Sequence, residues 1–263
     1  MNSVTTRLSQ EQIEQFQRDG FIAIDALIPP EEVEQLRHIY DRLFSDKTGW
    51  DRGDQFDLAG TDEGEATLPQ LLGPSRYAPE LQETHYVRTA RTIAQQLLGP
   101  DMTAGHGEHM IYKPAGRGAA TPWHQDQAYH DPTTRQRGVN FWLPLDEATV
   151  DSGCLHFVPG SHQFDVLPHH PINNDPRIHG LEVDDPQRWQ ERSVACPIPA
   201  GGATIHASYM LHSAHANTSP RPRRAYILTF RLPAEQREVP IDNYWKRNQQ
   251  TARQARAEQS QTR

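Results

Sequence analysis

The first hundred residues combine helical patterns with one apolar run. A Ser-x-x-Gln capping box comes before the first pattern and Gly20 follows it, which predicts a helix over residues 9–19. The apolar run 21–28 suits a buried strand that ends at two prolines. A helix is expected near residues 80–98, and another directly after the prolines, where large side chains form one stripe: Val33, Leu36, Tyr40 and Leu43.

Two stretches show neither the helical nor the strand period. Residues 45–80 are rich in Gly, Asp and Pro, with isolated aromatic side chains at Trp50 and Phe56. This composition predicts an irregular loop, which we expect to border a pocket. Residues 163–192 form a second long insertion with Pro and His, which we interpret as a lid or pocket loop.

From about residue 103 the pattern changes to short strands separated by Pro, Gly and Asn. The strand candidates are 107–113, 122–127, 138–145, 154–158, 193–198, 203–206, 209–213 and 224–232. This succession predicts a mainly β fold, a sandwich or jelly roll, with helices bracing one side. We expect a single domain over residues 1–244, with a helical part over 1–100 and a jelly-roll core over 103–233. Residues 245–263 are polar and Gln-rich and predict a solvated tail.

Composition narrows the classes of function. The chain has 263 residues, a formal net charge of −8 and a pI near 5.9. This charge argues against a nucleic-acid partner, because phosphates are neutralised by a basic surface. Cys154 and Cys196 are too few for a disulfide framework, and we expect both to be reduced.

The hydrophobic pattern also bears on location. No stretch approaches 18 apolar residues, so we expect no membrane span. No apolar segment follows Met1, so we expect no export signal and a cytoplasmic protein. The sequence leaves open whether the protein is a monomer or a homodimer.

The candidate chemistry lies in the motif His124-Gln125-Asp126 and in His212 and Arg223 further along the chain. Side chains two positions apart in a strand point to the same face, so His124 and Asp126 can reach one metal ion together. His212 can supply a third ligand, and Arg223 can bind an anion beside it. Two imidazoles and one carboxylate leave three octahedral positions open, an arrangement typical of non-haem iron(II) oxygenases.

Each of these residues also has a simpler interpretation. A His-x-Asp pair can be a hydrogen-bonded surface pair, and Arg223, with an arginine on either side, can form a structural ion pair at the start of a strand. His206 and His215 compete with His212 for the role of the distal ligand. We expect His206, in an apolar strand, to be a hydrogen-bonded core residue or a residue that supports the ligands.

Several separated motifs occur in a characteristic order along the chain: Trp123-His124-Gln125-Asp126, Trp142, Gly153-Cys154-Leu155, Pro159-Gly160-Ser161-His162, His212-Ser213, Asn217 and Arg223. Together they resemble the phytanoyl-CoA dioxygenase family of iron(II)/2-oxoglutarate oxygenases. The segment from Glu14 to Gly20, the strand after it and the Pro-Glu-Glu-Val start of the next helix also fit this family. The resemblance covers most of the chain.

The resemblance implies a double-stranded β-helix, a cupin-like jelly roll, with iron(II) at its open end. It implies that the iron ligands are His124, Asp126 and His212. It further implies that Arg223 pairs with the far carboxylate of 2-oxoglutarate, the cosubstrate. Other positions expected near the cosubstrate are Gln125, Trp142, His109 and Ser213, although Trp142 also suits a buried strand.

One position departs from the family pattern. Ala214 stands where the family usually has a serine that helps to bind the cosubstrate, and Ser213 is next to it. We therefore expect a cosubstrate pocket that is similar in plan and altered in detail.

The implied reaction consumes dioxygen, converts 2-oxoglutarate to succinate and carbon dioxide, and hydroxylates a C–H bond of a small organic molecule. Asp126 occupies the position that a halogenase on this scaffold leaves vacant for chloride, so hydroxylation is favoured, with desaturation, cyclisation and epimerisation open. The candidates for substrate contact are Gln127, Tyr129, His130 and His215. The irregular loops favour a partly apolar biosynthetic intermediate, and no more of the substrate follows from the sequence.

Two other functions fit part of the pattern. A zinc- or manganese-dependent hydrolase or isomerase on a related barrel would use the same three ligands, but it gives Arg223 no task. A non-catalytic 2-oxoglutarate-binding protein would keep the fold, and the intact set of ligands argues against it.

Overall fold

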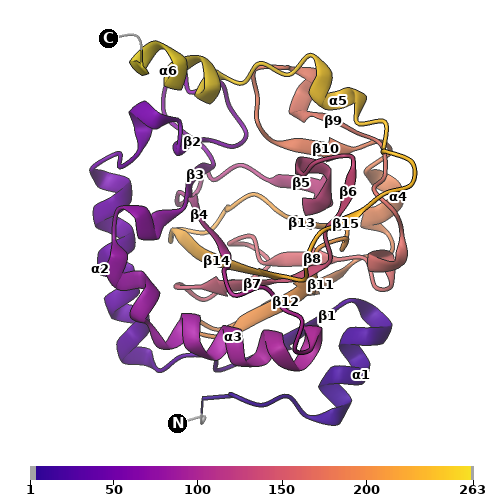
Figure 1. Ribbon diagram of the computed structural model, residues 1–263. Coiled ribbons are helices and arrows are strands. Elements are labelled where there is room, and N and C mark those ends of the chain that lie inside the picture. Colours follow the sequence, from indigo (N-terminus) through magenta and orange to yellow (C-terminus); the bar gives the residue numbers. More distant parts are fainter. Residues whose placement is uncertain (1–3, 262–263) are drawn as a thin grey trace.

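The computed structural model describes residues 4–261 and contains two antiparallel sheets with helices around them (Figure 1). The larger sheet has seven strands in the order β1-β12-β7-β14-β4-β3-β2, and the smaller has four in the order β11-β8-β13-β5. Two short pairs, β10-β9 and β15-β6, form separate two-stranded sheets. The predicted mainly β architecture with flanking helices is confirmed.

The strand bounds follow most of the candidates taken from the sequence. The larger sheet contains β1 (Phe21–Ile24), β2 (Gln55–Asp57), β3 (Pro69–Leu72), β4 (Gly107–Lys113), β7 (Gly138–Pro144), β12 (Ala203–Ala207) and β14 (Arg223–Arg231). The smaller sheet contains β5 (Thr121–His124), β8 (Leu155–Phe157), β11 (Val194–Cys196) and β13 (His212–Ala214). The short pairs are formed by β6 (Thr134–Arg135), β9 (His169–Pro171), β10 (Leu181–Val183) and β15 (Glu235–Gln236).

The three helices predicted in the first hundred residues are present. The α-helices are α1 (Gln10–Asp19), α2 (Pro30–Ser45), α3 (His85–Leu98), α4 (Gln187–Gln190), α5 (Tyr244–Arg247) and α6 (Ala252–Gln261). Short 3-10 helices are η1 (Trp50–Arg52), η2 (Pro74–Arg76), η3 (Pro79–Glu83), η4 (Asp126–Tyr129), η5 (Ser161–Gln163) and η6 (Ile172–Asn174).

Local signals explain where the first helix begins and ends. Ser9 and Gln12 form the predicted capping box, in which each side chain accepts a hydrogen bond from the other residue's backbone N–H. Gly20 ends the helix in the left-handed conformation, with φ of 84°. A Cβ atom at Gly20 would lie 2.4 Å from Nδ1 of His162, so this position requires glycine for space as well as for conformation.

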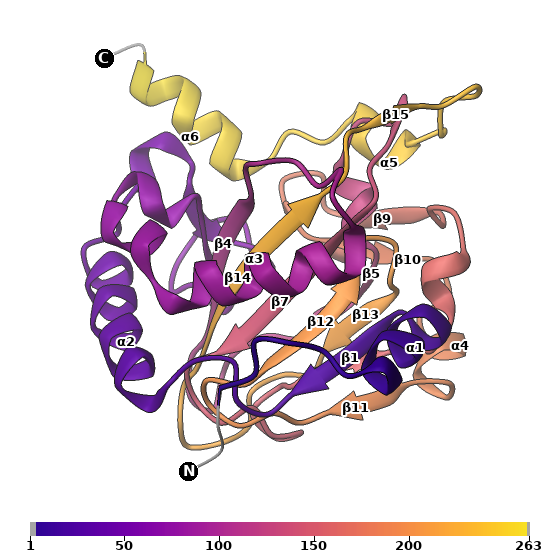
Figure 2. The same ribbon diagram turned by 60° about the horizontal axis from the view of Figure 1, so that its bottom comes forward.

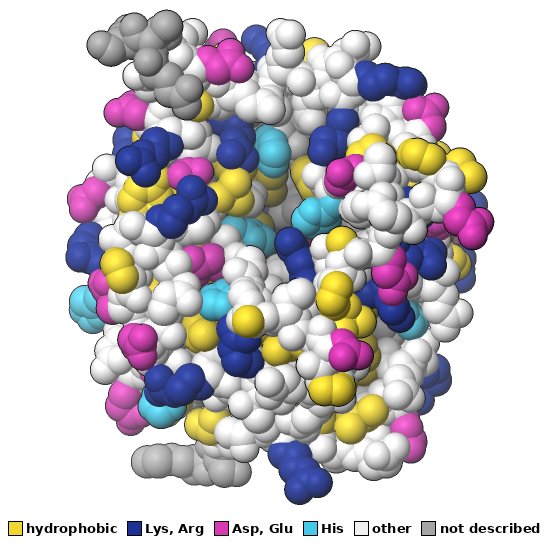
Figure 3. All heavy atoms as spheres, in the orientation of Figure 1, with side chains coloured by type: hydrophobic (Ala, Val, Ile, Leu, Met, Phe, Trp, Pro, Cys, Tyr) yellow, Lys and Arg dark blue, Asp and Glu magenta, His cyan; other side chains and the backbone are white. Residues whose placement is uncertain are grey.

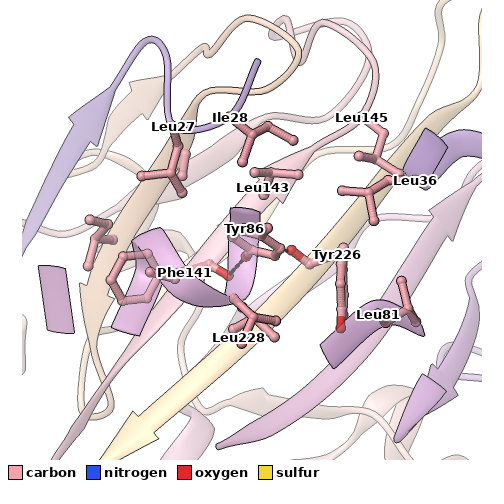
Figure 4. Close-up of a cluster of buried hydrophobic side chains, with 14 of the residues drawn as sticks. Leu27, Ile28, Leu36, Leu81, Tyr86, Phe141, Leu143, Leu145, Tyr226 and Leu228 are labelled. Atoms are coloured by element: carbon pink, nitrogen blue, oxygen red, sulfur yellow. Dashed lines mark hydrogen bonds between the residues drawn. The ribbon is translucent and has the colours of Figure 1, made fainter. Parts of the chain in front are cut away.

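The main core lies between α2, α3 and the outer face of the larger sheet, and Figure 2 shows α3 crossing that sheet over β14 and β7. Alternate residues of β14, Tyr226, Leu228 and Phe230, point into this core. Figure 4 shows Tyr86 of α3 beside Tyr226 and Leu228, and its buried hydroxyl lies 2.8 Å and 2.9 Å from the backbone carbonyls of Phe141 and Tyr226, which share its one hydrogen.

A second core fills the space between the two sheets. Trp142 and Ile227 from the larger sheet meet Leu155, Phe157 and Cys196 from the smaller one. Strands β7 and β14 therefore have one face in each core. Cys154 and Cys196 are free and buried, as expected.

The segment 45–80 differs from the predicted irregular loop. It contributes β2 and β3 to the edge of the larger sheet, where Leu71 of β3 is the partner of Met110 of β4. These strands have three and four residues; β2 pairs with β3, and β3 pairs with β4, which begins only at Gly107. No local pattern could therefore reveal them.

The predicted strand over 21–28 is also shorter than expected. It ends at Ile24, and the backbone N–H groups of Leu27 and Ile28 both donate to the carbonyl of Gly201 outside the ladder. The segment 163–192, predicted to be a lid or pocket loop, contains β9, β10 and α4, so it has regular secondary structure.

The C-terminal segment differs from the predicted solvated tail over residues 245–263, of which 262 and 263 lie outside the described residues. Trp245 is 6% exposed, and its indole N–H donates to the carbonyl of Ala128. On α6, Arg256 donates to the carbonyls of Trp50 and Gln55. Several of its polar side chains donate to backbone carbonyls of the rest of the chain, which composition alone does not reveal. Figure 1 shows α5 and α6 lying along one end of the sheets.

Among residues 4–261, every helix is too short or too polar to cross a lipid bilayer.

Candidate metal centre and its pocket

Two histidines lie directly opposite each other in the smaller sheet. His124 is the last residue of β5 and His212 is the first of β13, and the two are cross-strand partners. Partners in an antiparallel pair project to the same face. Their ring centroids are 4.2 Å apart. The register of β5 and β13 thus brings together two histidines that are far apart in the sequence.

Asp126 joins this pair. The strand ends at His124, but Gln125 keeps an extended backbone, with φ of −116° and ψ of 132°, so the next side chain returns to the face of His124. Oδ1 of Asp126 lies 3.6 Å from Nε2 of His124 and 3.9 Å from Nε2 of His212. One ligand atom from each of the three residues lies within 4.8 Å of the others, a separation that suits a shared metal ion.

Both imidazoles present Nε2 to this centre because Nδ1 is hydrogen-bonded elsewhere. Nδ1 of His124 lies 2.8 Å from the carbonyl of Pro122, and Nδ1 of His212 lies 2.9 Å from that of Met210. A carbonyl only accepts, so Nδ1 carries the hydrogen and Nε2 keeps its lone pair. Burial lowers the pKa of His212 well below its ordinary value, which favours the neutral imidazole that binds metals.

The other carboxylate oxygen of Asp126 is held by the larger sheet. Asn140 of β7 donates to Oδ2 across 2.5 Å and accepts at its own Oδ1 from the hydroxyl of Thr229, 2.6 Å away on β14. Nε2 of His206 lies 3.5 Å from the same Oδ2. Burial acts to raise the pKa of Asp126, but the imidazoles around it, His212 first, outweigh burial and lower the pKa well below its usual range.

Arg223 lies in the same cavity as these residues. The cavity has a volume of about 410 Å³, and Figure 3 shows a hollow on this face with histidine and Lys or Arg side chains around it. Arg223 is 1% exposed, and its Cζ lies 5.0 Å from the centre of the Trp142 ring. Its Nε and Nη1 have no hydrogen-bond partner among residues 4–261. A buried cation without a counter-charge is costly, so this guanidinium predicts an anionic ligand.

The sequence profile described as phytanoyl-CoA dioxygenase (PhyH) matches residues 16–225, most of the chain. The chain belongs to the phytanoyl-CoA dioxygenase family. This is a family of iron(II)/2-oxoglutarate-dependent oxygenases, so the predicted family and enzyme class are confirmed.

Solved structures agree with this assignment. EvdO2 from Micromonospora carbonacea var. aurantiaca, solved in complex with 2-oxoglutarate, is 37% identical, with a TM-score of 0.80 over 93% of this chain and 99% of that chain. The carbocyclase SnoK from nogalamycin biosynthesis is 22% identical, with a TM-score of 0.72 over 94% of each chain, and shows the same fold. Among curated relatives, the ectoine dioxygenase of Nocardia farcinica is 26% identical over 87% of this chain and 79% of its own length. The predicted double-stranded β-helix is confirmed.

Four further residues that the family pattern or its neighbourhood suggested line the cavity. They are His109 on β4, Trp142 on β7, Tyr129 at the end of η4, and His130 directly after it. Burial lowers the pKa of His109 to about 4, so this imidazole is neutral at physiological pH.

Gln125 does not face the cavity. Its side chain is fully buried, donates to the carbonyls of Tyr209 and Asp165, and accepts from the N–H of Leu167. The alternation that brings residues 124 and 126 to the metal centre turns Gln125 the other way. Its expected contact with the cosubstrate is therefore replaced by a structural role, that of joining three backbone segments behind the centre.

Ser213 also points away from the cavity, which His212 and Ala214 on either side of it line. His215 stacks on His156, with ring centroids 4.1 Å apart, and does not line the cavity. Gln127 is buried within η4 and is likewise absent from the cavity wall. The expected roles of these three residues in binding cosubstrate or substrate have no support in the fold.

The structure adds cavity residues that the motifs did not single out: Asn140, His179, Arg231 and Arg253. Strand alternation was a usable signal for two of them, because Asn140 lies two residues before Trp142, and Arg231 lies eight residues after Arg223. His179 reaches the cavity from the segment 163–192, and Arg253 reaches it from α6. No local sequence pattern predicted either position. His206, expected to be a core or supporting residue, lies beside Asp126 as that interpretation requires.

Proposed function

We propose that this chain binds iron(II) through His124, Asp126 and His212, binds 2-oxoglutarate through Arg223, and hydroxylates a C–H bond of a small organic molecule. The observation that carries the proposal is the buried, unpaired guanidinium in the same cavity as three metal-binding side chains. A dicarboxylate cosubstrate gives that cation a partner, whereas a metal-dependent hydrolase leaves it without one.

When bound, iron(II) and 2-oxoglutarate supply, with dioxygen, the oxidation of the C–H bond and the release of succinate and carbon dioxide. The protein contributes side chains that are already held in the orientation that binding requires. Hydrogen bonds at Nδ1 orient both imidazoles, and Asn140 orients the carboxylate of Asp126. The ring of Trp142 beside Arg223 restricts the plane of the guanidinium, which favours a bidentate grip on a carboxylate.

The apolar wall of the cavity supports the same role. Leu155, Ala214 and Ile227 line it and also belong to the core between the sheets, so they exclude water from around Arg223. In a dry environment the attraction between guanidinium and carboxylate is stronger. Ala214, in place of the usual serine, offers no hydroxyl, and Arg223 carries more of the binding of the far carboxylate.

We further propose that the substrate is a biosynthetic intermediate. The cavity volume of about 410 Å³ suits a small molecule, and similar proteins include a carbocyclase from nogalamycin biosynthesis and an ectoine dioxygenase. Tyr129 and His130 are the proposed substrate contacts near the centre, and His109 and Trp142 the proposed neighbours of the cosubstrate.

Succinate formation tests the function. The purified protein is incubated in air with iron(II) and 2-oxoglutarate, with and without candidate substrates, and succinate is measured by mass spectrometry. We expect slow succinate release that candidate substrates accelerate, and none in the absence of oxygen. Hydrolysis of a substrate that requires zinc or manganese and proceeds without succinate would instead establish a metal hydrolase.

A further inference from the structure

One strand of the larger sheet carries an arginine at each end of the cavity. On β14, Arg223, Ile227, Thr229 and Arg231 all line the cavity, because they lie an even number of residues apart and share a face. At the usual rise, the Cα atoms of Arg223 and Arg231 are about 27 Å apart along the strand. Thr229 supports the metal centre through Asn140, so Arg231 lies on the side opposite Arg223.

Two glycines leave room for the Arg231 side chain. Gly138 is the cross-strand partner of Arg231, and a Cβ atom there would lie 3.1 Å from Cγ of the arginine. On the other side, a Cβ atom at Gly107 would lie 3.5 Å from Nη2 of Arg231. Within residues 4–261, the guanidinium of Arg231 makes no ion pair and its side chain donates no hydrogen bond. It lies in the cavity wall with its donors free.

A second arginine reaches the cavity from the C-terminal helix. Arg253 of α6 lines the cavity, with its Cζ 4.4 Å from the centre of the Phe56 ring, and pairs with no carboxylate in the described chain. The helix is held by Arg256, which stacks 3.7 Å from the centre of the Trp50 ring and forms an ion pair with Asp62. The contacts of Arg256 thus keep Arg253 at the cavity.

The carboxylates of the wall do not neutralise these two cations. Among the described residues, two carboxylates line the cavity: Asp126, which belongs to the metal centre, and Glu108. Glu108 accepts from Ser75 at Oε1 and from the hydroxyl of Tyr226, 2.5 Å from Oε2. A chain with a formal net charge of −8 therefore presents two unpaired guanidinium groups to its cavity.

We propose that the substrate is an organic acid, and that Arg231 and Arg253 bind its carboxylate, sulfate or phosphate groups while its remainder lies beside the metal centre. Planar guanidinium groups bind such oxyanions through paired, charge-assisted hydrogen bonds. Both arginines lie beyond residues 16–225, the part of the chain that the family profile matches. The inference rests on the proposed function, which assigns Arg223 to the cosubstrate.

A pair of fluorescent probes tests the charge requirement directly. Anilinonaphthalene sulfonate is titrated into the full chain loaded with manganese(II) and saturating 2-oxoglutarate, which occupies Arg223, and phenylnaphthylamine serves as the same fluorophore without the sulfonate. We expect the sulfonate to bind more tightly than the neutral probe. Arg231→Gln and Arg253→Gln should each weaken sulfonate binding about tenfold and leave the neutral probe unaffected.

Arg188→Gln is the matched control, because Arg188 also lies over an aromatic ring, 4.8 Å from the centre of Trp189, but outside the cavity. Unchanged sulfonate affinity in both cavity variants, or equal binding of the two probes to the wild type, would overturn the proposal. Displacement of the sulfonate probe by acetate and by inorganic phosphate then assigns the class of acid. The more effective competitor identifies a carboxylate or a phosphate. If neither displaces the probe, the proposal is also overturned.

These outcomes are separate from failure of the proposed function. Probe binding to the manganese(II) form needs no turnover, whereas the proposed function fails if the wild type forms no succinate with iron(II) in air. If the protein forms succinate but binds both probes equally, the proposed function stands and the proposal of an acidic substrate fails.

Discussion

Asn140 donates a hydrogen bond across 2.5 Å to Oδ2 of Asp126, and this leaves Oδ1 as the carboxylate oxygen that faces Nε2 of His124 and His212. The amide comes from the larger sheet, whereas the carboxylate follows a strand of the smaller one. A contact between the two sheets therefore selects which oxygen is presented to a metal ion.

Replacing Asn140 with alanine should weaken metal binding about tenfold to a hundredfold, the usual range for residues that support metal ligands. Calorimetric titration with manganese(II) measures this without turnover. Thr229→Val removes only the hydrogen bond that orients Asn140 and should have a smaller effect in the same direction. An unchanged affinity in Asn140→Ala would show that the contact does not orient the carboxylate.

Replacing Asp126 with alanine should abolish iron(II) binding and succinate formation while the fold is retained. The main core lies on the other face of the larger sheet, away from the centre. We expect a loss of about 1–3 kcal/mol, because the amide of Asn140 is left without its acceptor, and a fall in Tm of about 2–10 °C. Circular dichroism checks that the fold is retained, and an iron-binding assay checks that iron(II) binding is lost. Turnover in Asp126→Ala would count heavily against the proposed centre.

Replacing Arg223 with glutamine should raise the KM for 2-oxoglutarate about tenfold to a hundredfold, since a charge-assisted pair is lost in a dry pocket. Arg223→Lys should restore part of the affinity, because an ammonium keeps the charge but not the bidentate geometry. Arg221→Gln, an exposed neighbour beside Glu147, is the control. If the KM for the organic substrate rose instead, Arg223 would belong to the substrate site.

Stability should fall in acid because of His169. Nδ1 of this buried ring lies 2.6 Å from the carbonyl of Leu167, and Nε2 accepts from the N–H of Gln125 across 3.2 Å, so the fold requires the neutral form. Burial lowers its pKa to about 3. The unfolded chain has a histidine pKa of about 6.5.

The sign follows from these two values. Between about pH 6.5 and pH 3 the unfolded state binds a proton at His169 and the folded state does not, so stability decreases as pH falls, by up to about 1.4 kcal/mol per pH unit. Urea unfolding at several pH values between 7 and 5 measures the slope. His169→Gln should be less stable at pH 7 and lose stability less steeply, and an equal slope in the variant would refute this assignment.

Replacing Arg256 with alanine should release α6 without unfolding the rest of the chain. The substitution removes the stacking on Trp50, the ion pair with Asp62 and two hydrogen bonds to backbone carbonyls. Hydrogen exchange should rise over residues 252–261 and around 50–57. Arg247→Ala, which loses one exposed pair with Asp242, should leave exchange unchanged. Equal protection in both variants would mean that other contacts hold the helix.

Sequence patterns predicted the elements whose signals are local. The capping box before α1 and Gly20 after it act within a few residues, and the first three helices followed. The His-x-Asp pair is local in the same sense, because strand geometry places its two ligands on one face. By contrast, β2 and β3 are short strands that join the larger sheet through the pairing of β3 with the distant β4, so their own residues carried little signal.

The sequence by itself determined the family, the fold class and which residue types gather for chemistry, because these depend on motifs and on periods that neighbouring residues share. Strand alternation indicates which residues share a face, but only the tertiary structure decided which of these faces line the cavity. Gln125 and Ser213 turn away from it, while Asn140, Arg231 and Arg253 reach it from two strands and a C-terminal helix. The reason is physical: the direction of a side chain depends on strand register and on where each strand ends, and both are set by partners far away in the sequence.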